Sequence, residues 1–186
     1  MAKQRSIVRD IAETAVLTVA IFLVVRVALQ NFKVEGQSME PNLHNSEYIL
    51  VNKIDYMLHP PQRDDVIVFR AVPAGHPDRD FIKRVIALPG ETVAIHDDKV
   101  FINGKQLAEH FARRSMNYTF PASKVPKNEY FVLGDNRANS EDSHLWKWLP
   151  KSDIIGKAWV SYWPPHEAHI FEVAHGGLSS LVESIL

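Results

Sequence analysis

The sequence predicts a mainly β fold, an antiparallel β-sheet domain preceded by one N-terminal transmembrane helix. One apolar stretch of helical length lies near the N-terminus, and short runs rich in β-branched and aromatic residues follow it. Eleven prolines separate those runs, as is typical of strands joined by turns. We expect a cytoplasmic terminus and membrane anchor over 1–30, a β-rich extracytoplasmic domain over 31–165 and a tail over 166–186.

The composition narrows the class of protein. The chain has 186 residues, of which 46% are hydrophobic, and this is enough to bury a core and argues against general disorder. Its net charge of −1 gives no electrostatic reason to expect nucleic acid as a partner. The absence of cysteine excludes disulfides, thiolate metal sites and a cysteine nucleophile.

The apolar stretch over 11–29 has the properties of a membrane anchor. As a helix it would be ~28 Å long, close to the thickness of bilayer hydrocarbon. Lys3, Arg5 and Arg9 precede it, so the positive-inside rule keeps the N-terminus in the cytoplasm and exports the rest. No Ala-x-Ala-like cleavage site follows, which favours an uncleaved anchor over a secretory signal or a buried helix.

The region after the anchor is strand-like. At least seven candidate strands lie over 47–53, 65–70, 80–87, 92–96, 99–102, 129–133 and 157–163. Asp97 and Asp98 predict a tight hairpin turn between the fourth and fifth of them. No ten-residue helical pattern interrupts the series, so we expect antiparallel pairing. The polar stretch over 108–127 is loop-like.

The last nine residues have a different pattern. Leu178, Leu181, Val182, Ile185 and Leu186 fall on one face of a short helix. So short a helix is not stable alone, and it either packs on the body of the protein or lies on the membrane surface.

Two segments carry residues that can do chemistry together. Ser38 lies within 36–41 (Gly-Gln-Ser-Met-Glu-Pro), nine residues after the anchor, and Lys83 lies in a strand-like run. A serine hydroxyl needs a base to become a nucleophile, and a lysine is that base only where its surroundings keep it neutral. Lowering a lysine pKa to about 7–8 costs on the order of 4 kcal/mol, which burial can supply. Taken singly, each residue is more often an ordinary loop serine or a solvent-facing lysine on an edge strand.

A third segment, 134–144, reads Gly-Asp-Asn-Arg-Ala-Asn-Ser-Glu-Asp-Ser-His and combines turn residues with hydroxyls and a carboxylate. With Ser-Met-x-Pro-x-Leu over 38–43, the run over 65–69 and Lys-Arg-Val-Ile-x-Leu-Pro-Gly over 83–90, it completes an ordered set of motifs. Through this set the chain resembles the type I signal peptidases, membrane serine peptidases that remove signal peptides from exported proteins. The short polar middle resembles the compact forms of Gram-positive bacteria.

The resemblance implies a role for five residues. Ser38 is the nucleophile, with its backbone N–H as the main oxyanion donor, and Lys83 is the general base. Ser140 matches the serine that orients the lysine, and Asp142 matches a carboxylate that holds the loop. Met39, beside the nucleophile, helps to shape the site. No metal or cofactor is implied.

The implied reaction is cleavage of exported preproteins after an Ala-x-Ala pattern, through an acyl-enzyme. An extended substrate adds as an edge strand, and its P1 and P3 side chains then enter two adjacent small pockets. The expected partners are signal peptides and the lipid bilayer, with no nucleic acid, and the expected location is the plasma membrane, crossed once. The oligomeric state is not indicated.

The chain departs from the family pattern at three positions. Gly36 stands where some members carry a serine as a second oxyanion donor. Asp64 replaces the glycine that usually precedes the central strand. His144 replaces an arginine after Asp-Ser, which puts a permanent ion pair with Asp142 in doubt, since histidine is fully charged only below a pKa of about 6.5. Arg84 and Asp135 match positions that are better interpreted as structural.

Other interpretations remain open on the residues alone. His166, His169 and His175 could hold a metal, although no His-Glu-x-x-His motif occurs. A triad of Ser38 with a histidine and an aspartate, His44 and Asp135, is formally possible. A self-cleaving repressor-type protease shares serine/lysine chemistry but lacks the anchor, and an inactive, membrane-tethered binding protein could retain the fold.

Overall fold

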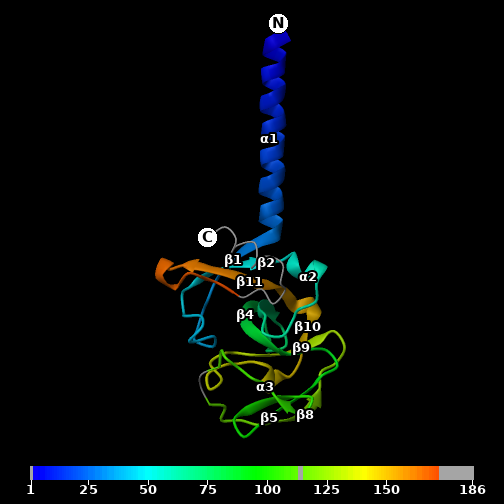
Figure 1. Cartoon of the computed structure of the whole chain (residues 1–186), viewed down its shortest axis with the longest axis vertical. Coiled ribbons are helices and arrows are strands. Elements are labelled where there is room, and N and C mark those ends of the chain that lie inside the picture. The colour runs from blue at the N-terminus through cyan, green and yellow to red at the C-terminus, as the bar shows by residue number, and fades with distance from the viewer. Residues whose placement is uncertain (1, 113–114, 172–186) are drawn as a thin grey trace.

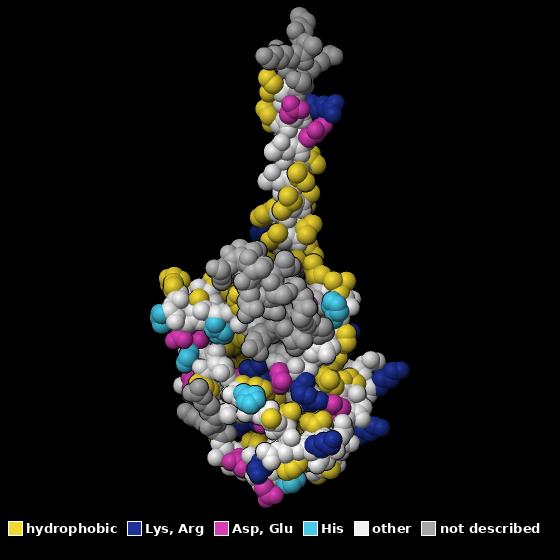
Figure 2. All heavy atoms as spheres, viewed as in Figure 1, with side chains coloured by type: hydrophobic (Ala, Val, Ile, Leu, Met, Phe, Trp, Pro, Cys, Tyr) yellow, Lys and Arg dark blue, Asp and Glu magenta, His cyan; other side chains and the backbone are white. Residues whose placement is uncertain are grey.

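A long helix stands on a β-rich body in the computed structural model, which describes residues 2–112 and 115–171 (Figure 1). The helix, α1 (Ala2–Ala28), contains a stretch, Arg9–Ala28, that is long and apolar enough to cross a membrane. The side chains over 9–27 are exposed, and Figure 2 shows hydrophobic ones along this part of the helix, with charged ones spread over the body. The prediction of an N-terminal apolar helix is confirmed, although this helix begins earlier than residue 11.

The helix passes into the first strand without a linker. α1 ends at Ala28, and β1 (Leu29–Lys33) begins at the next residue. The N–H of Lys53 donates to the Ala28 carbonyl over 2.8 Å, so the end of the helix is also bonded to the chain that follows β2 (Tyr48–Asn52). β1 was not predicted, because Leu-Gln-Asn-Phe-Lys is largely polar and lies at the edge of its sheet.

The larger sheet has the order β1-β2-β11-β3-β4-β9-β10, with β12 paired to β11, and every pairing is antiparallel. Its other strands are β3 (Val66–Ala71), β4 (His76–Ala87), β9 (Glu129–Leu133), β10 (Leu149–Pro150), β11 (Ile154–Trp163) and β12 (His169–Ile170). The antiparallel, mainly β fold is therefore confirmed. β4 is four residues longer at its start than predicted.

A smaller four-stranded sheet has the order β7-β6-β5-β8. Its strands are β5 (Thr92–His96), β6 (Lys99–Ile102), β7 (Lys105–Gln106) and β8 (Phe120–Lys124). Asp97 and Asp98 both have positive φ angles, as a two-residue hairpin turn requires, so the predicted hairpin is confirmed. The prediction of a loop throughout 108–127 is wrong at β8, which pairs with β5 although only Phe120 of its residues is buried.

The remaining elements are single turns. They are α2 (Asp55–Leu58), α3 (Ser143–Trp146) and the 3₁₀ turns η1 (Lys151–Asp153) and η2 (Pro165–Glu167). After α1, no described helix exceeds four residues, in agreement with the predicted absence of longer helical patterns.

The tail continues on the larger sheet as far as the structure describes it. β12 pairs with β11, and the N–H of Phe171 donates to the carbonyl of Trp159 over 2.9 Å. The helix predicted over 178–186 lies outside the described residues, and the expected boundary at 165/166 stays a prediction.

One core cluster fixes the chain that follows β1. Val34, Met39 and Leu43 are buried in it, together with residues of β2, β3, β4 and β11. A segment with three buried anchors in ten residues is held firmly on the sheet, and Ser38 lies between two of those anchors.

Candidate active site

An open cleft of about 600 Å³ lies over the loop that carries Ser38. Its lining comes from β1, the loop, β2, β3, β4 and the segment around Asn139. Because Met39 points into the core and is 1% exposed, the half-buried Ser38 beside it is left facing the cleft. Met39 thus supports the site from beneath and does not line the cleft.

Lys83 projects from β4 towards Ser38. Its Nζ lies 2.7 Å from Ser38 Oγ and 3.0 Å from the Ile82 carbonyl oxygen, and the residue is 4% exposed. β4 lies between β3 and β9, so the alternative of a solvent-facing lysine on an edge strand is wrong.

The environment of Lys83 favours the neutral amine. Burial lowers its pKa to about 8, although the carboxylates of Asp142, Glu141 and Asp135 oppose this by raising it. At that pKa about a tenth of the molecules carry a neutral amine at pH 7, against a few in ten thousand for an ordinary lysine. A neutral amine at hydrogen-bond distance from a hydroxyl can act as its general base.

A second loop is hydrogen-bonded to the backbone at Ser38. The Asn136 N–H donates to the Ser38 carbonyl over 3.0 Å, and the Asn136 side-chain amide donates to the Gln37 carbonyl over 2.9 Å. A Cβ on Gly134 would lie less than 3.0 Å from both the Ser38 carbonyl oxygen and Ser140 Oγ, so this position has no room for a side chain. The sequence pattern around Asn136 predicted only a turn; its position in the third motif, two residues after Gly134, was the available signal.

Asp142 holds this loop together. Its Oδ2 accepts from the Gly134 N–H over 2.9 Å, and its Oδ1 caps the N-terminus of α3. His144 Nδ1 lies 2.7 Å from the same Oδ1, and the imidazole stacks on Tyr118 with ring centroids 3.8 Å apart. An imidazole with its proton on Nδ1 donates to this carboxylate whether or not it is charged, so the contact with Asp142 does not depend on a permanent cation.

The Ser140 hydroxyl has no bond to Lys83 in this structure. Its Oγ is buried and makes no hydrogen bond with any described residue. The expectation that Ser140 orients the lysine stays a prediction.

Asp135 and Arg84 form a structural pair. Arg84 Nε and Nη2 donate to the two carboxylate oxygens of Asp135 over 2.8 and 2.7 Å, and Asn42 Nδ2 adds a third bond of 2.8 Å. His44 contacts Glu47 instead, so the side chains of a Ser-His-Asp triad do not come together.

The departures at Asp64 and Gly36 have conformational explanations. Asp64 adopts φ +70°, the left-handed region where glycine has no steric penalty and aspartate is tolerated better than most residues. Gly36 adopts φ +89° and donates its N–H to Asn45 Oδ1 over 2.9 Å. No hydroxyl projects from this position, and the amide side chains that line the cleft belong to Gln37 and Asn139.

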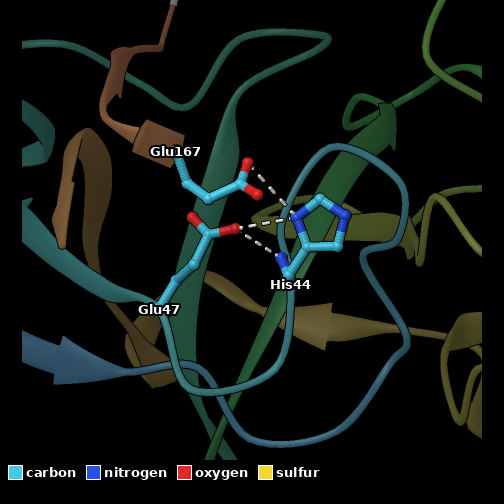
Figure 3. Close-up of side chains that lie close together, drawn as sticks. All are labelled: His44, Glu47 and Glu167. Carbon is cyan, nitrogen blue, oxygen red and sulfur yellow. Dashed lines mark hydrogen bonds and ion pairs between the residues drawn. The ribbon is translucent and has the colours of Figure 1, made fainter. Parts of the chain in front are cut away.

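A group of possible metal ligands lies outside the cleft lining. Among the described residues, ligand atoms of His44, Glu47 and Glu167 lie within 4.8 Å of one another (Figure 3). The predicted alternative of His166, His169 and His175 is not this group, since His169 Nδ1 contacts a backbone carbonyl and His175 lies outside the described residues.

Comparison with known proteins gives matches over most of the chain. A family model described as signal peptidase, peptidase S26, matches residues 8–163. Signal peptidase I of Leptolyngbya laminosa is 40% identical over 157 residues, covering 79% of this chain and 77% of that protein. Probable signal peptidase I-2 of Synechocystis sp. is 36% identical over 159 residues, covering 83% and 73%. A crystal structure of a signal peptidase I from Enterococcus faecalis V583 is 33% identical and covers 53% of this chain and 97% of that one, with a TM-score of 0.47.

Proposed function

Because this chain belongs to the signal peptidase family, peptidase S26, we propose that it is a membrane-anchored serine endopeptidase with Ser38 and Lys83 as its catalytic dyad. Membership supports the general activity, the cleavage of signal peptides from preproteins. The observation that carries the dyad is the 2.7 Å separation of Lys83 Nζ from Ser38 Oγ inside a cleft, with the lysine pKa lowered by burial to about 8.

The dyad acts by nucleophilic catalysis. Neutral Lys83 takes the Ser38 proton while Oγ attacks the scissile carbonyl, and the ammonium then gives that proton to the leaving amine. The resulting acyl-enzyme is hydrolysed by water, for which Lys83 is again the base. The Ser38 N–H receives the developing oxyanion, and the two bonds from Asn136 to the adjoining carbonyls hold that N–H in place.

The cleft takes an extended peptide with small side chains before the scissile bond. Four aliphatic residues are in its lining, Val34, Ile49, Val68 and Ile82. Apolar walls favour apolar side chains such as alanine, and alternate residues of an extended strand point to the same face. This supports the Ala-x-Ala preference at P3 and P1.

The anchor brings the cleft to its substrates. α1 is long enough to span the bilayer, and the cationic residues that precede it favour a cytoplasmic N-terminus. The β-rich body then lies on the outer side of the plasma membrane, where signal peptides of exported preproteins emerge.

Two variants test the dyad in the full chain, kept in detergent and mixed with a preprotein that has an Ala-x-Ala site. Ser38→Ala and Lys83→Ala should each abolish cleavage while circular dichroism shows a folded β domain. Ser123→Ala and Lys124→Ala, on the small sheet, are the matched controls and should cleave normally. Near-normal turnover by Lys83→Ala would overturn the dyad. A wild-type chain that cleaves no preprotein would instead favour the inactive, membrane-tethered binding protein.

A further inference from the structure

A buried carboxylate, a partly exposed carboxylate and an imidazole converge on one point beside the loop that carries Ser38 (Figure 3). His44 Nδ1 lies 3.1 Å from Glu47 Oε1 and 3.6 Å from Glu167 Oε2. The Glu47 side chain is only 2% exposed, and Ser161 Oγ donates to its second oxygen over 2.6 Å. The arrangement is therefore fixed from the core side and open on the side of His44 and Glu167.

Hydrogen bonding satisfies Glu47 but not Glu167. The His44 backbone N–H donates to Glu47 Oε1 over 2.6 Å, whereas the Glu167 oxygens lie 3.6 Å from His44 Nδ1 and 3.8 Å from His166 Nε2, beyond hydrogen-bond distance. The single Nδ1–H of an imidazole can serve Glu47 or Glu167, but not both at once. In the part of the chain that the structure describes, no lysine or arginine forms an ion pair with either carboxylate. Among the described residues, the exposed His166 also lies within ion-pair distance of Glu167, with its Nε2 3.8 Å from Oε1. With both imidazoles neutral, the two carboxylates carry an uncompensated negative charge. A divalent cation bound between the three atoms would neutralise that charge and satisfy all of them.

The separations of the two carboxylate oxygens from His44 Nδ1 suit a tetrahedral transition metal. With metal–ligand bonds of about 2.0–2.2 Å, tetrahedral ligand atoms lie ~3.4 Å apart. The two measured separations from His44 Nδ1, 3.1 and 3.6 Å, are on either side of that value. A mixed set of imidazole and carboxylate ligands selects metals such as Zn²⁺ over Ca²⁺ or Mg²⁺, which take all-oxygen sets. The exposed side leaves the fourth position to water.

The geometry points to a divalent transition-metal site formed by His44, Glu47 and Glu167. Binding replaces the Nδ1 proton of His44, which either moves to Nε2 or is released to solvent. None of the three residues lines the cleft, so the inference does not rest on the proposed catalytic dyad.

The site would join the wall of the cleft to the tail. Glu47 precedes β2, and its backbone carbonyl accepts from the Val34 N–H over 2.8 Å; Val34 lines the cleft. Glu167 belongs to η2, which follows β11. A metal here would hold η2 against the segment 34–47 and would stabilise the folded protein.

Calorimetric titration with Zn²⁺ tests the site. The full chain, without a histidine tag, is stripped with a chelator, dialysed in detergent and titrated with Zn²⁺ alone. We expect one equivalent to bind, with a rise in the unfolding temperature that saturates at the same ratio. Glu167→Gln should weaken the affinity at least tenfold and remove most of that rise. This variant should fold, since Glu167 is partly exposed and lies in a short surface turn.

Three controls make the outcome decisive. His96→Asn changes the exposed His96–Asp97 pair, which has two possible ligands, and it should bind Zn²⁺ as the wild type does. His44→Asn should behave like Glu167→Gln, since the asparagine side chain removes the imidazole ligand. The absence of binding, or binding that survives Glu167→Gln, would overturn the site. Equal affinity for Ca²⁺ would overturn the assignment to a transition metal.

Discussion

Replacing Lys83 by methionine should abolish cleavage and, at neutral pH, make the fold more stable. A pKa unit corresponds to about 1.4 kcal/mol, so lowering the pKa of Lys83 from 10.5 to about 8 costs about 3 kcal/mol of folding free energy below pH 8. Methionine fills a similar volume without a charge. It loses the contacts with Ser38 and with the Ile82 carbonyl, at about 1 kcal/mol each, so the net gain at pH 7 is about 1–2 kcal/mol.

The pH dependence of that difference is the sharper test. The pKa of Lys83 is lower in the folded chain than in the unfolded chain, so between pH 8 and 10.5 the unfolded chain binds more protons. The wild type therefore gains stability with rising pH in this window, and the cost of burying Lys83 falls from about 3 kcal/mol at pH 7 to about 1 kcal/mol at pH 10.

Equilibrium urea unfolding of the detergent-solubilised full chain, followed by tryptophan fluorescence, measures both quantities. The stability advantage of Lys83→Met over the wild type should shrink by about 2 kcal/mol between pH 7 and pH 10. Lys124→Met is the control, since it removes an exposed lysine of β8. Its stability relative to the wild type should not change in this way between pH 7 and pH 10. The same advantage at both pH values would refute the reasoning that burial keeps this amine neutral.

Three further predictions concern the same site. In the wild type, kcat/KM should rise about tenfold from pH 7 to pH 9 as the neutral fraction of Lys83, with its pKa of about 8, grows from about 9% to about 91%; a flat pH–rate profile would contradict the role of general base. Asn136→Ala should lower kcat at least tenfold and change KM much less, because it frees the carbonyls next to the oxyanion donor; steady-state kinetics that show an effect on KM alone would exclude a positioning role. Gly134→Ala should reduce both activity and unfolding temperature, since its Cβ would overlap the Ser38 carbonyl oxygen and Ser140 Oγ, and a fully active, equally stable variant would show that the loops are not packed as described.

The strands that could be predicted from the sequence are those in which apolar and polar residues alternate or in which nearly all residues are apolar. The central run around Ile67 and the runs of β5, β6 and β9 have this property, and their predicted ranges lie close to the observed ones. β1, β7, β8, β10 and β12 were missed. These strands are short or polar and depend on a neighbour for their hydrogen bonds, and that information is not local.

The contact between Ser38 and Lys83 could not be predicted from local sequence patterns either, because it joins residues that are far apart in the chain. The two residues are 45 positions apart, and their contact depends on the burial of Met39 beside one and the strand position of the other. Only the resemblance to a family linked them in advance. The bonds from Asn136 to the backbone of Gln37 and Ser38 join residues about 100 positions apart, and the contact of His44 with Glu167 joins residues still farther apart. These contacts could be found only in the structure.

The junction of α1 with β1 has a consequence for how the proposed enzyme meets its substrates. A flexible linker would let the catalytic body tumble above the bilayer and sample many heights. Here the helix ends at Ala28, the strand starts at Leu29, and the bond from Lys53 closes the corner, so the body has little freedom to move relative to the helix. A membrane-bound signal peptide would then meet a cleft held at a nearly constant distance from the lipid. Encounter becomes a search within the plane of the membrane, at a raised effective concentration, and peptides whose scissile bond lies at another depth are excluded by geometry.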